Sequence, residues 1–425
     1  MQYDVLIIGG GPAGSSLATR LAQMGRSVRL VEKEQFPRFH IGESLLPFAM
    51  PLFEQLGVAE QLADRFLIKH GAEFVTGDGS LVRRYPFAEG VVAGPGYAYE
   101  VDRAEFDQLL LDNAAAHGVS VEQGSRVTDF RIDPAEGVEV SVRDGAGQVH
   151  RETARVIVDA TGQRALLAGH FELRQMDPDL KNFAVFSHYE GAARASGERE
   201  GDITIVVVPE GWWWVIPLKG DRTSLGLVAP GRHLQGKKPD EQYFLEKVAA
   251  VPYLAERFQG ARRVAKVRTI SDYSYVSRRF AGDRWLLVGD AAAFIDPVFS
   301  TGVYLGMLGA FRAAETLDRA LGRERYSRRE FAGYERWLRH VVERYKGFVS
   351  GFYRPEFVEA MMNPTDRFQL RQAVTSLLAG RATGSFAVTW RIWVFQAITR
   401  INRSYPLIPR LPGRREADQG VSASM

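Results

Sequence analysis

The chain has 425 residues, of which 45% are hydrophobic and 25% are charged, and it contains 42 Gly, 19 Pro and no Cys. This is a globular composition with enough length for about two or three domains, which excludes disordered, collagen-like and fibrous classes. The lack of Cys excludes a disulfide, a Cys-ligated zinc site, an iron–sulfur cluster and a thiol nucleophile. Lys and Arg (54) nearly balance Asp and Glu (51), so the charge gives no reason to expect a nucleic-acid partner.

The sequence also lacks the signals of a membrane or exported protein. The apolar residues 386–401 are interrupted by Arg391 and Arg400, whereas a membrane-spanning helix needs about 20 apolar residues with few charges. The N-terminus has no basic region and no cleavage site. We therefore expect a cytoplasmic protein without a transmembrane segment, and we predict no metal site.

Taken in chain order, the first elements predict a βαβ unit. Residues 3–8 form a short apolar run typical of a strand, residues 15–24 have apolar residues at helical spacing, and residues 27–31 indicate a second strand. This opening favours an α/β fold with a parallel sheet. Further on, we expect a helix at 101–117, strands at 119–143, 153–158, 183–228 and 285–288, and mainly helices from residue 301.

A glycine-rich turn lies between the first strand and the first helix. Gly9, Gly11 and Gly14 match G-x-G-x-x-G, with Pro12 and Ala13 between them. Such glycines permit a tight turn, a close approach of the backbone to a pyrophosphate, and close packing of helix on strand. Glu32 closes the second strand, 23 residues after Gly9, where an acid accepts hydrogen bonds from a ribose hydroxyl. This pattern predicts a dinucleotide site but leaves NAD and FAD undecided.

A second signal favours FAD. Gly289 and Asp290 follow a buried strand far downstream, and residues 159–162 (D-A-T-G) close a third strand. In FAD enzymes of the glutathione-reductase and hydroxybenzoate-hydroxylase types, an Asp at this position binds the ribityl chain near the pyrophosphate. The order of the three motifs therefore favours FAD over NAD.

These motifs predict an α/β fold with an FAD-binding Rossmann-like domain of the hydroxybenzoate-hydroxylase type. We assign residues 1–75, 99–165 and 270–330 to this discontinuous domain. Residues 76–98 and 166–269 are expected to form an inserted antiparallel β-sheet substrate domain. Residues 331–425 are expected to form a helical C-terminal region with a loose tail.

Three stretches resemble the flavin-dependent halogenases, specifically the branch that acts on phenols and pyrroles. Residues 41–47 (I-G-E-S-L-L-P) are similar to the segment that follows the second strand in this branch. Residues 212–217 fit W-x-W-x-I-P, and residues 294–302 fit F-x-x-P-x-x-S-x-G. The resemblance covers residues 1 to about 400. Related prenyl reductases and aromatic hydroxylases share the FAD motifs but usually lack the last two patterns, and they remain the alternative function.

The resemblance implies a chemistry and a halide site. Reduced flavin and O₂ would form a flavin hydroperoxide, and chloride or bromide would attack it to give hypohalous acid. The halide would lie at Ser300, Thr301 and Gly302, where backbone amides at a turn entering a helix can hold an anion. Trp212 and Trp214, on one face of a strand, and Phe294 would line the flavin side. Core packing alone explains the tryptophans equally well.

The family also steers hypohalous acid with a lysine, by a hydrogen bond or as a haloamine. Lys69 matches that lysine by its position after residues 41–47 and by the Gly-Ala that follows at 71–72. A desolvated lysine would have a lowered pKa. The alternative is an ordinary surface lysine.

Other cofactor contacts are carried over by position. The resemblance places Arg38 and Ser44 beside the flavin, Arg103 near the FAD phosphate or adenine, and the backbone of Val127 at the adenine. Lys33 and Pro297 complete the implied FAD contacts.

The expected partners follow from the same resemblance. Because the sequence holds no second glycine fingerprint for a nicotinamide cofactor, we expect a separate flavin reductase. The substrate would be a small phenol or pyrrole, free or tethered to an acyl or peptidyl carrier protein. The basic residues Arg323, Arg325, Arg328 and Arg329 could dock an acidic carrier, but a solvated helix face is the favoured interpretation of this run.

Overall fold

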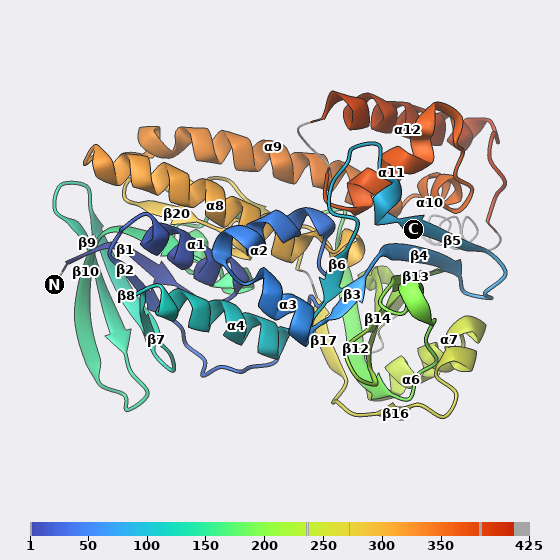
Figure 1. Cartoon of the computed structure of the whole chain (residues 1–425), viewed down its shortest axis with the longest axis horizontal. Helices are drawn as coiled ribbons and strands as arrows, with labels where there is room; N and C mark the ends of the chain where they lie inside the picture. Colours follow the sequence, from blue (N-terminus) through green and yellow to red (C-terminus); the bar gives the residue numbers. More distant parts are fainter. Residues whose placement is uncertain (1, 235, 237, 272, 382–384, 412–425) are drawn as a thin grey trace.

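The computed structural model describes residues 2–234, 236, 238–271, 273–381 and 385–411, and the expected loose tail lies outside this range. Two sheets lie side by side, with helices over the first and a helical C-terminal part over one end of the second (Figure 1). The α/β fold with a second, largely antiparallel sheet agrees with the prediction.

The first sheet is built on parallel strands that are buried on both faces. Val5 to Ile8 have 6% exposure or less, as expected for parallel strands covered by helices. In register, Val5 lies opposite Val28 on one side and Val156 on the other. The order is β19-β20-β10-β1-β2-β7, and β9 pairs with β10 and β8. Its strands are β1 (Gln2–Ile8), β2 (Val28–Val31), β7 (Ser120–Glu122), β8 (Arg126–Asp133), β9 (Gly137–Arg143), β10 (Val149–Asp159), β19 (Ala281–Gly282) and β20 (Trp285–Leu287).

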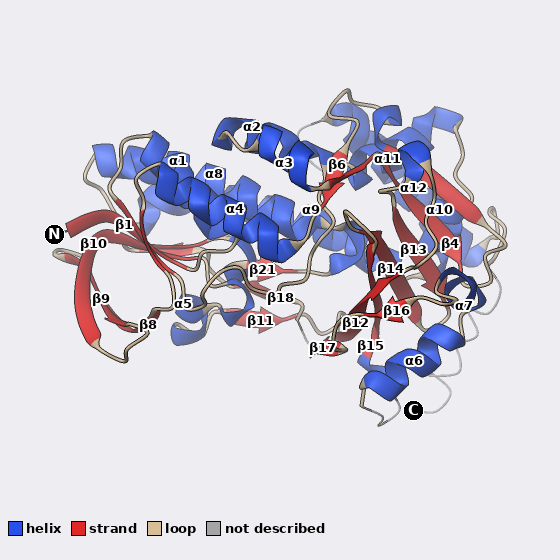
Figure 2. Ribbon diagram, turned by 60° about the horizontal axis from the view of Figure 1, so that its bottom comes forward, coloured by secondary structure: helices blue, strands red, loops and turns tan. Residues whose placement is uncertain are grey.

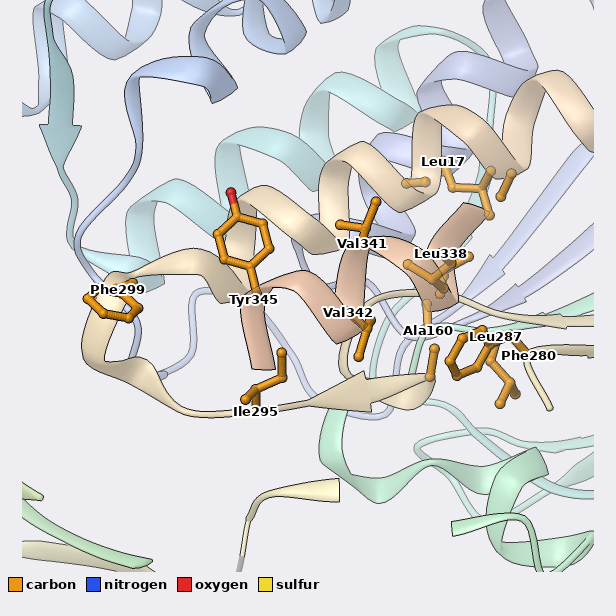
Figure 3. Packing of buried hydrophobic residues seen from close by; sticks show 14 of the residues in the cluster. Leu17, Ala160, Phe280, Leu287, Ile295, Phe299, Leu338, Val341, Val342 and Tyr345 are labelled. Atoms are coloured by element: carbon orange, nitrogen blue, oxygen red, sulfur yellow. The ribbon is translucent and has the colours of Figure 1, made fainter. Parts of the chain in front are cut away.

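The helices that cover this sheet come from distant parts of the chain. Helix α1 packs against both α4 and α8, and α9 lies over α8 and β19. Figure 3 shows Leu338 of α9 close to Leu287 and Ala160 of the sheet region. The helices named here and their neighbours are α1 (Pro12–Gln23), α2 (Met50–Leu56), α3 (Ala59–Arg65), α4 (Arg103–Ala116), α5 (Leu166–His170), α8 (Thr301–Gly322) and α9 (Arg328–Phe352).

The second sheet carries the tryptophan strand. Because side chains alternate along a strand, Trp212 and Trp214 belong to the large core shared with the first sheet, whereas Trp213 packs against Phe244 on the opposite face. The order is β16-β12-β15-β14-β13-β4-β5, and β17 also pairs with β12. Its strands are β4 (Gly71–Thr76), β5 (Val82–Pro86), β12 (Asn182–Glu190), β13 (Ile203–Val208), β14 (Gly211–Pro217), β15 (Arg222–Pro230), β16 (Arg262–Arg263) and β17 (Arg268–Ser271). Helices α6 (Glu241–Ala249) and α7 (Pro252–Arg257) cover its outer face (Figure 2).

Two small sheets connect these layers. β3 (Leu67–Lys69) pairs with β6 (Ala98–Glu100), and β11 (Arg174–Met176) pairs with β18 (Tyr275–Ser277), which pairs with β21 (Ala293–Phe294). We expect the first segment of the FAD-binding domain to extend to residue 75, whereas β4, which begins at Gly71, pairs parallel with β13 inside the second sheet. Likewise β17 pairs with β12, although we assigned residues from 270 onward to the FAD-binding domain. At these two places the chain therefore enters the second sheet before residue 71 and leaves it after residue 271.

The C-terminal part is helical, as predicted. Helices α10, α11 and α12 pack on one another and reach the second sheet through β5 (Figure 1). No helix within the described residues is both long enough and apolar enough to cross a membrane. The bounds are α10 (Pro355–Met362), α11 (Leu370–Leu378) and α12 (Phe386–Ser404).

Candidate active site

A long cavity runs from the carboxyl ends of the first sheet to the face of the second sheet. Such an edge of parallel strands is where doubly wound folds bind nucleotides. The far end lies against β14 and the turn that leads into α8. Most predicted site residues line this cavity: Gly9, Gly11, Pro12, Ala13, Glu32, Lys33, Arg38, Ser44, Arg103, Val127, Trp212, Trp214, Asp290, Phe294, Pro297, Ser300 and Gly302.

Three predicted residues lie behind this lining. Gly14 is within the first turn of α1, and Thr301 begins α8, where it lines a smaller adjacent hollow. Lys69 lies behind Ser44, to which its ammonium group donates a hydrogen bond. The sequence missed other lining residues, among them His40, Ser125, Gln163, Phe186, Ile203 and Tyr273. They carry no motif, and only the fold brings them to the cavity.

The glycine turn has the geometry of a pyrophosphate cradle. Gly9 has φ +108°, and a Cβ there would lie 2.4 Å from the carbonyl oxygen of Ala160. A Cβ on Gly11 would face the cavity, where its nearest neighbour is Arg38 Nη2 at 3.7 Å. Gly11 is also the N-cap of α1 and supplies no side-chain cap, so the first amides of the helix are available to an anion. These features fit the pyrophosphate of FAD.

Glu32 is fixed by backbone amides beside this turn. Its Oε2 accepts a hydrogen bond from the amide of Gly10 at 2.7 Å, and its Oε1 accepts one from the amide of Glu34 at 2.8 Å. Each carboxylate oxygen retains a further acceptor position. The buried carboxylate therefore stays available to a ribose hydroxyl in the cavity, which fits the predicted role.

Asp107 holds the two arginines that border the middle of the cavity. It accepts hydrogen bonds from Arg103 Nε at 2.8 Å and Nη2 at 3.0 Å, and it pairs with Arg38 Nη1 at 2.9 Å. Arg103 Nη1 donates to the carbonyl oxygen of Ile41 at 2.6 Å. Arg103 thus anchors the segment that leads to Ser44, a positioning role that sequence reasoning missed.

Asp290 follows β20 in the cavity wall, as the FAD motif requires. Desolvation raises its pKa to about 6, and the nearby positive charge of Arg103 partly opposes this rise. Its backbone carbonyl accepts a hydrogen bond from the hydroxyl of Tyr275 at 2.6 Å. This hydrogen bond fixes the backbone of Asp290, and the residue lines the cavity, where its carboxyl group can meet a polar chain.

Asp290→Asn is expected to weaken the pH dependence of stability in the FAD-free protein. Folded Asp290 keeps its proton up to about pH 6, whereas the unfolded chain releases it near its ordinary pKa. Wild type therefore loses stability as pH rises through this interval, and Asn cannot titrate. Thermal unfolding at about pH 4 and pH 7 should show a smaller difference for the variant. The exposed control Asp64→Asn should match wild type. If the stability of Asp290→Asn changed between the two pH values as much as that of wild type, the assignment would be contradicted.

The second-sheet end of the cavity is aromatic. The Trp212 and Trp214 rings lie 6.2 Å apart, and Phe186 lies 5.8 Å from Trp214. Trp214 Nε1 donates to Ser224 Oγ at 3.0 Å. Gly226 lies directly beneath the same indole, where a Cβ would approach to 2.2 Å. Both tryptophans therefore pack in the core and also line the cavity, so core packing does not exclude the predicted place beside the flavin.

A buried polar network fixes Trp212. Its Nε1 donates to the hydroxyl of Tyr353 at 3.1 Å, and Tyr353 donates to Asp296 Oδ2 at 2.7 Å. Asn182 Nδ2 also donates to Asp296 Oδ2 at 3.0 Å, and the amide of Val298 donates to Oδ1 at 3.0 Å. Burial raises the pKa of Asp296 to about 6. Asp296 lies inside the quoted 294–302 stretch, yet its partners come from β12 and the end of α9.

The turn before α8 brings backbone amides toward the cavity. Ser300 adopts the left-handed conformation (φ 55°, ψ 28°) and precedes the 22-residue α8 without capping it through its side chain. A Cβ on Gly302 would meet only the ring of Phe294, at 3.6 Å. The N-terminus of α8 therefore borders the cavity, which Ser300, Gly302 and Phe294 line, and a helix N-terminus is suited to a small anion.

Lys69 is completely enclosed rather than exposed on the surface. Its side chain is 1% exposed, and its Nζ donates to Ser44 Oγ at 2.6 Å and to the carbonyl oxygen of Leu45 at 2.8 Å. Nζ also lies 3.7 Å from Glu100 Oε1 and 5.3 Å from the centre of the Phe87 ring. Desolvation lowers the pKa of Lys69, and Glu100 and Asp202 partly oppose this. The surface interpretation is therefore excluded.

Comparison with known proteins identifies the family. The profile of the FAD binding domain family matches residues 2–345. A 1H-pyrrole-2-carbonyl-(peptidyl-carrier protein) chlorinase of Pseudomonas fluorescens is 31% identical over 399 residues, which cover 87% of this chain and 88% of the relative. The chain belongs to the flavin-dependent halogenases.

Two more proteins are similar to this halogenase. The corresponding brominase of Pseudoalteromonas luteoviolacea is 33% identical over 389 residues, covering 89% of this chain and 92% of the relative. The solved structure of the flavin-dependent brominase Bmp2 superimposes with a TM-score of 0.83 at 31% identity, covering 94% of this chain and 100% of that chain. FAD is therefore the cofactor of this halogenase, and the long cavity has the residues to hold it.

Proposed function

We propose that this halogenase places chlorine or bromine on an electron-rich phenol or pyrrole ring, free or tethered to a carrier protein. The position of Lys69 carries the proposal: its fully enclosed amino group is one hydrogen bond behind Ser44 in the cavity wall. An enclosed amine beside a flavin cavity suits the capture of an electrophilic halogen. The pyrrole chlorinase and brominase named above support the ring and the halogens.

Each predicted residue then has a role in the proposed reaction. Bound reduced FAD, together with O₂, supplies the oxidising equivalents that convert a halide into hypohalous acid. The amides of Thr301 and Gly302, after the turn at Ser300, would hold the halide. Trp212 and Trp214 would limit the access of water and substrate to that end of the cavity. Lys69 would bind the hypohalous acid and direct its halogen to the ring.

The proposed supply of electrons is a separate flavin reductase. The sequence contains one glycine fingerprint, and the structure uses it at the turn between β1 and α1. Reduced FAD would then enter from outside. The cavity, which reaches solvent-exposed Lys33 at its nucleotide end, is compatible with exchange of the cofactor.

The test supplies the purified protein with FAD, NADH, a flavin reductase, O₂ and a phenol, a pyrrole-2-carboxylate or a carrier-bound pyrrole. Omission of chloride and bromide is the control. Mass spectrometry should show a product with the halogen isotope pattern that depends on both the halide and the reductase. A hydroxylated ring, a reduced prenyl chain with a prenyl probe, or a product formed without halide would overturn the proposal.

A further inference from the structure

A buried carboxyl group is the charged neighbour of Lys69. Lys69 ends β3 and Glu100 ends β6, two strands that pair antiparallel in a small sheet between the larger ones. A bridge from Ser44 to Glu100 adds a third segment to this sheet. The side chains of Glu100 and Lys69 are 0% and 1% exposed. No motif in the sequence indicated Glu100.

Two consecutive hydrogen bonds lead from Lys69 through Ser44 to Glu100. Lys69 Nζ donates to Ser44 Oγ at 2.6 Å, and Ser44 Oγ donates to Glu100 Oε1 at 3.2 Å. The direct separation of Nζ and Oε1 is 3.7 Å, so the serine hydroxyl is the shorter route for a proton. Ser44 also lines the flavin cavity. The hydroxyl therefore links the cavity, the amine and the carboxyl group.

We propose that Glu100 accepts the proton of Lys69 through Ser44 and so prepares a neutral amine for the halogen. Glu100 is a positioning residue here, because it acts through Lys69 and does not touch the substrate. The inference rests on the proposed function of Lys69 and adds the group that sets its protonation state.

The surroundings of the pair favour the neutral form. Burial disfavours charge on both groups: it raises the pKa of Glu100 to about 8, although Lys69 and Ser44 oppose the rise, and it lowers the pKa of Lys69. Glu43 and Asp202 also raise the pKa of Glu100. Glu100 Oε2 has no hydrogen-bond partner among the described residues, which costs less for a carboxylic acid than for a carboxylate.

The neighbouring charges have partners of their own. Glu43 Oε1 lies 2.6 Å from His188 Nε2, and Asp202 accepts a hydrogen bond from Arg84 at 2.7 Å. The charged and titratable groups that act on Lys69 and Glu100 are thus Glu43 with His188 and Asp202 with Arg84. Because Glu43 and Asp202 have these partners, Ser44 is the residue whose hydroxyl group hydrogen-bonds to both Lys69 and Glu100.

Protons, bonds and electrons balance over one round of halogenation. First, the Lys69 ammonium and the Glu100 carboxylate become an amine and a carboxylic acid. The amine then reacts with hypohalous acid: an N–H bond and the halogen–oxygen bond break, an N–halogen bond forms, and water leaves. Finally the halogen moves to a ring carbon, which is oxidised by two electrons while the halogen is reduced. The ring proton and the Glu100 proton pass to Lys69 nitrogen, and transfer of one proton back to Glu100 restores the neutral amine and carboxylic acid.

Glu100→Gln tests the inference, because the amide keeps the shape and the hydrogen bond from Ser44 but cannot hold the proton. We expect kcat to fall by about 10²-fold, the usual contribution of a positioned acid or base. In wild type the rate should fall as pH rises through about 8, because Glu100 then lacks the proton that it passes to Lys69 nitrogen when the halogen leaves. In the variant this limb should be absent. The control Glu335→Gln, at a buried carboxylate paired with Arg328 and Arg339, should retain it.

A second variant and an infrared spectrum give results that do not depend on the folding or the turnover of Glu100→Gln. Ser44→Ala should be slower and should move the limb to higher pH, because the serine hydrogen bond lowers the pKa of Glu100. Infrared difference spectra of wild type at neutral pH should show a protonated carboxyl band that Glu100→Gln lacks. An ionised Glu100 below pH 8, or an unchanged limb in Glu100→Gln, would overturn the inference. Absence of any halogenated product from wild type would instead overturn the proposed function.

Discussion

Replacing Lys69 by Ala should abolish halogenation while FAD stays bound. The enclosed amino group lies one hydrogen bond behind Ser44 in the cavity wall, and its removal takes away the amine proposed to bind hypohalous acid. A loss of about 10²- to 10⁴-fold is expected for a group of this kind. Because Lys69 does not line the cavity, FAD absorbance after gel filtration should match wild type. Lys69→Met, which preserves most of the side-chain volume, should be equally inactive.

The control for this result is Lys266→Ala, at an exposed lysine, which should retain wild-type turnover. Glu100 would remain buried in both Lys69 variants, but its raised pKa lets it stay protonated and neutral at neutral pH. The fold should therefore persist. Halogenated product at the wild-type rate from Lys69→Ala would show that another group directs the halogen.

Gly14→Ala should have the largest effect on folding and cofactor binding. The added Cβ would lie 1.9 Å from the carbonyl oxygen of Gly9 and 3.1 Å from the Cβ of Ala160. Neither neighbour can yield cheaply, because Gly9 itself is fixed in the turn at φ +108°. Helix α1 must then move away from the strand, carrying its first amides with it. We expect a loss of about 3 kcal/mol and a large loss of FAD affinity.

Thermal unfolding and titration with FAD measure the two effects. The matched control is Gly333→Ala, an exposed helical position in α9 where an added Cβ meets nothing within 4 Å. Because Ala favours a helix over Gly, this control should be stabilised by about 1 kcal/mol. If Gly14→Ala unfolded and bound FAD like wild type, the close packing described here for the turn would be wrong.

The FAD end of the molecule could be predicted well from the sequence because its signals are local. A strand, a glycine turn, a helix and an acid follow one another within residues 2–32, and the structure places them as β1, α1 and Glu32. Asp290 was likewise found from its position after a strand. In each case the residues that decide the geometry are neighbours in the chain.

The charge partners of the site could not be predicted, because they are neighbours only in space. Glu100 is 31 positions from Lys69, and Tyr353 is 57 positions from Asp296. The pairing of β4 could not be predicted for a similar reason: β4 follows β3 closely in sequence but pairs with β13, more than a hundred residues later. Burial, which sets the pKa values of Glu100 and Lys69, also depends on the complete fold.

A single-turnover experiment tests the central claim most directly. FAD-loaded protein is reduced without O₂, mixed with a pyrrole or phenol probe, and then exposed to O₂ with bromide, with chloride or without halide. We predict one halogenated ring per bound flavin at most, with the isotope pattern of the halide added, and no modified ring when halide is omitted. A hydroxylated ring, or the same product with and without halide, would contradict it.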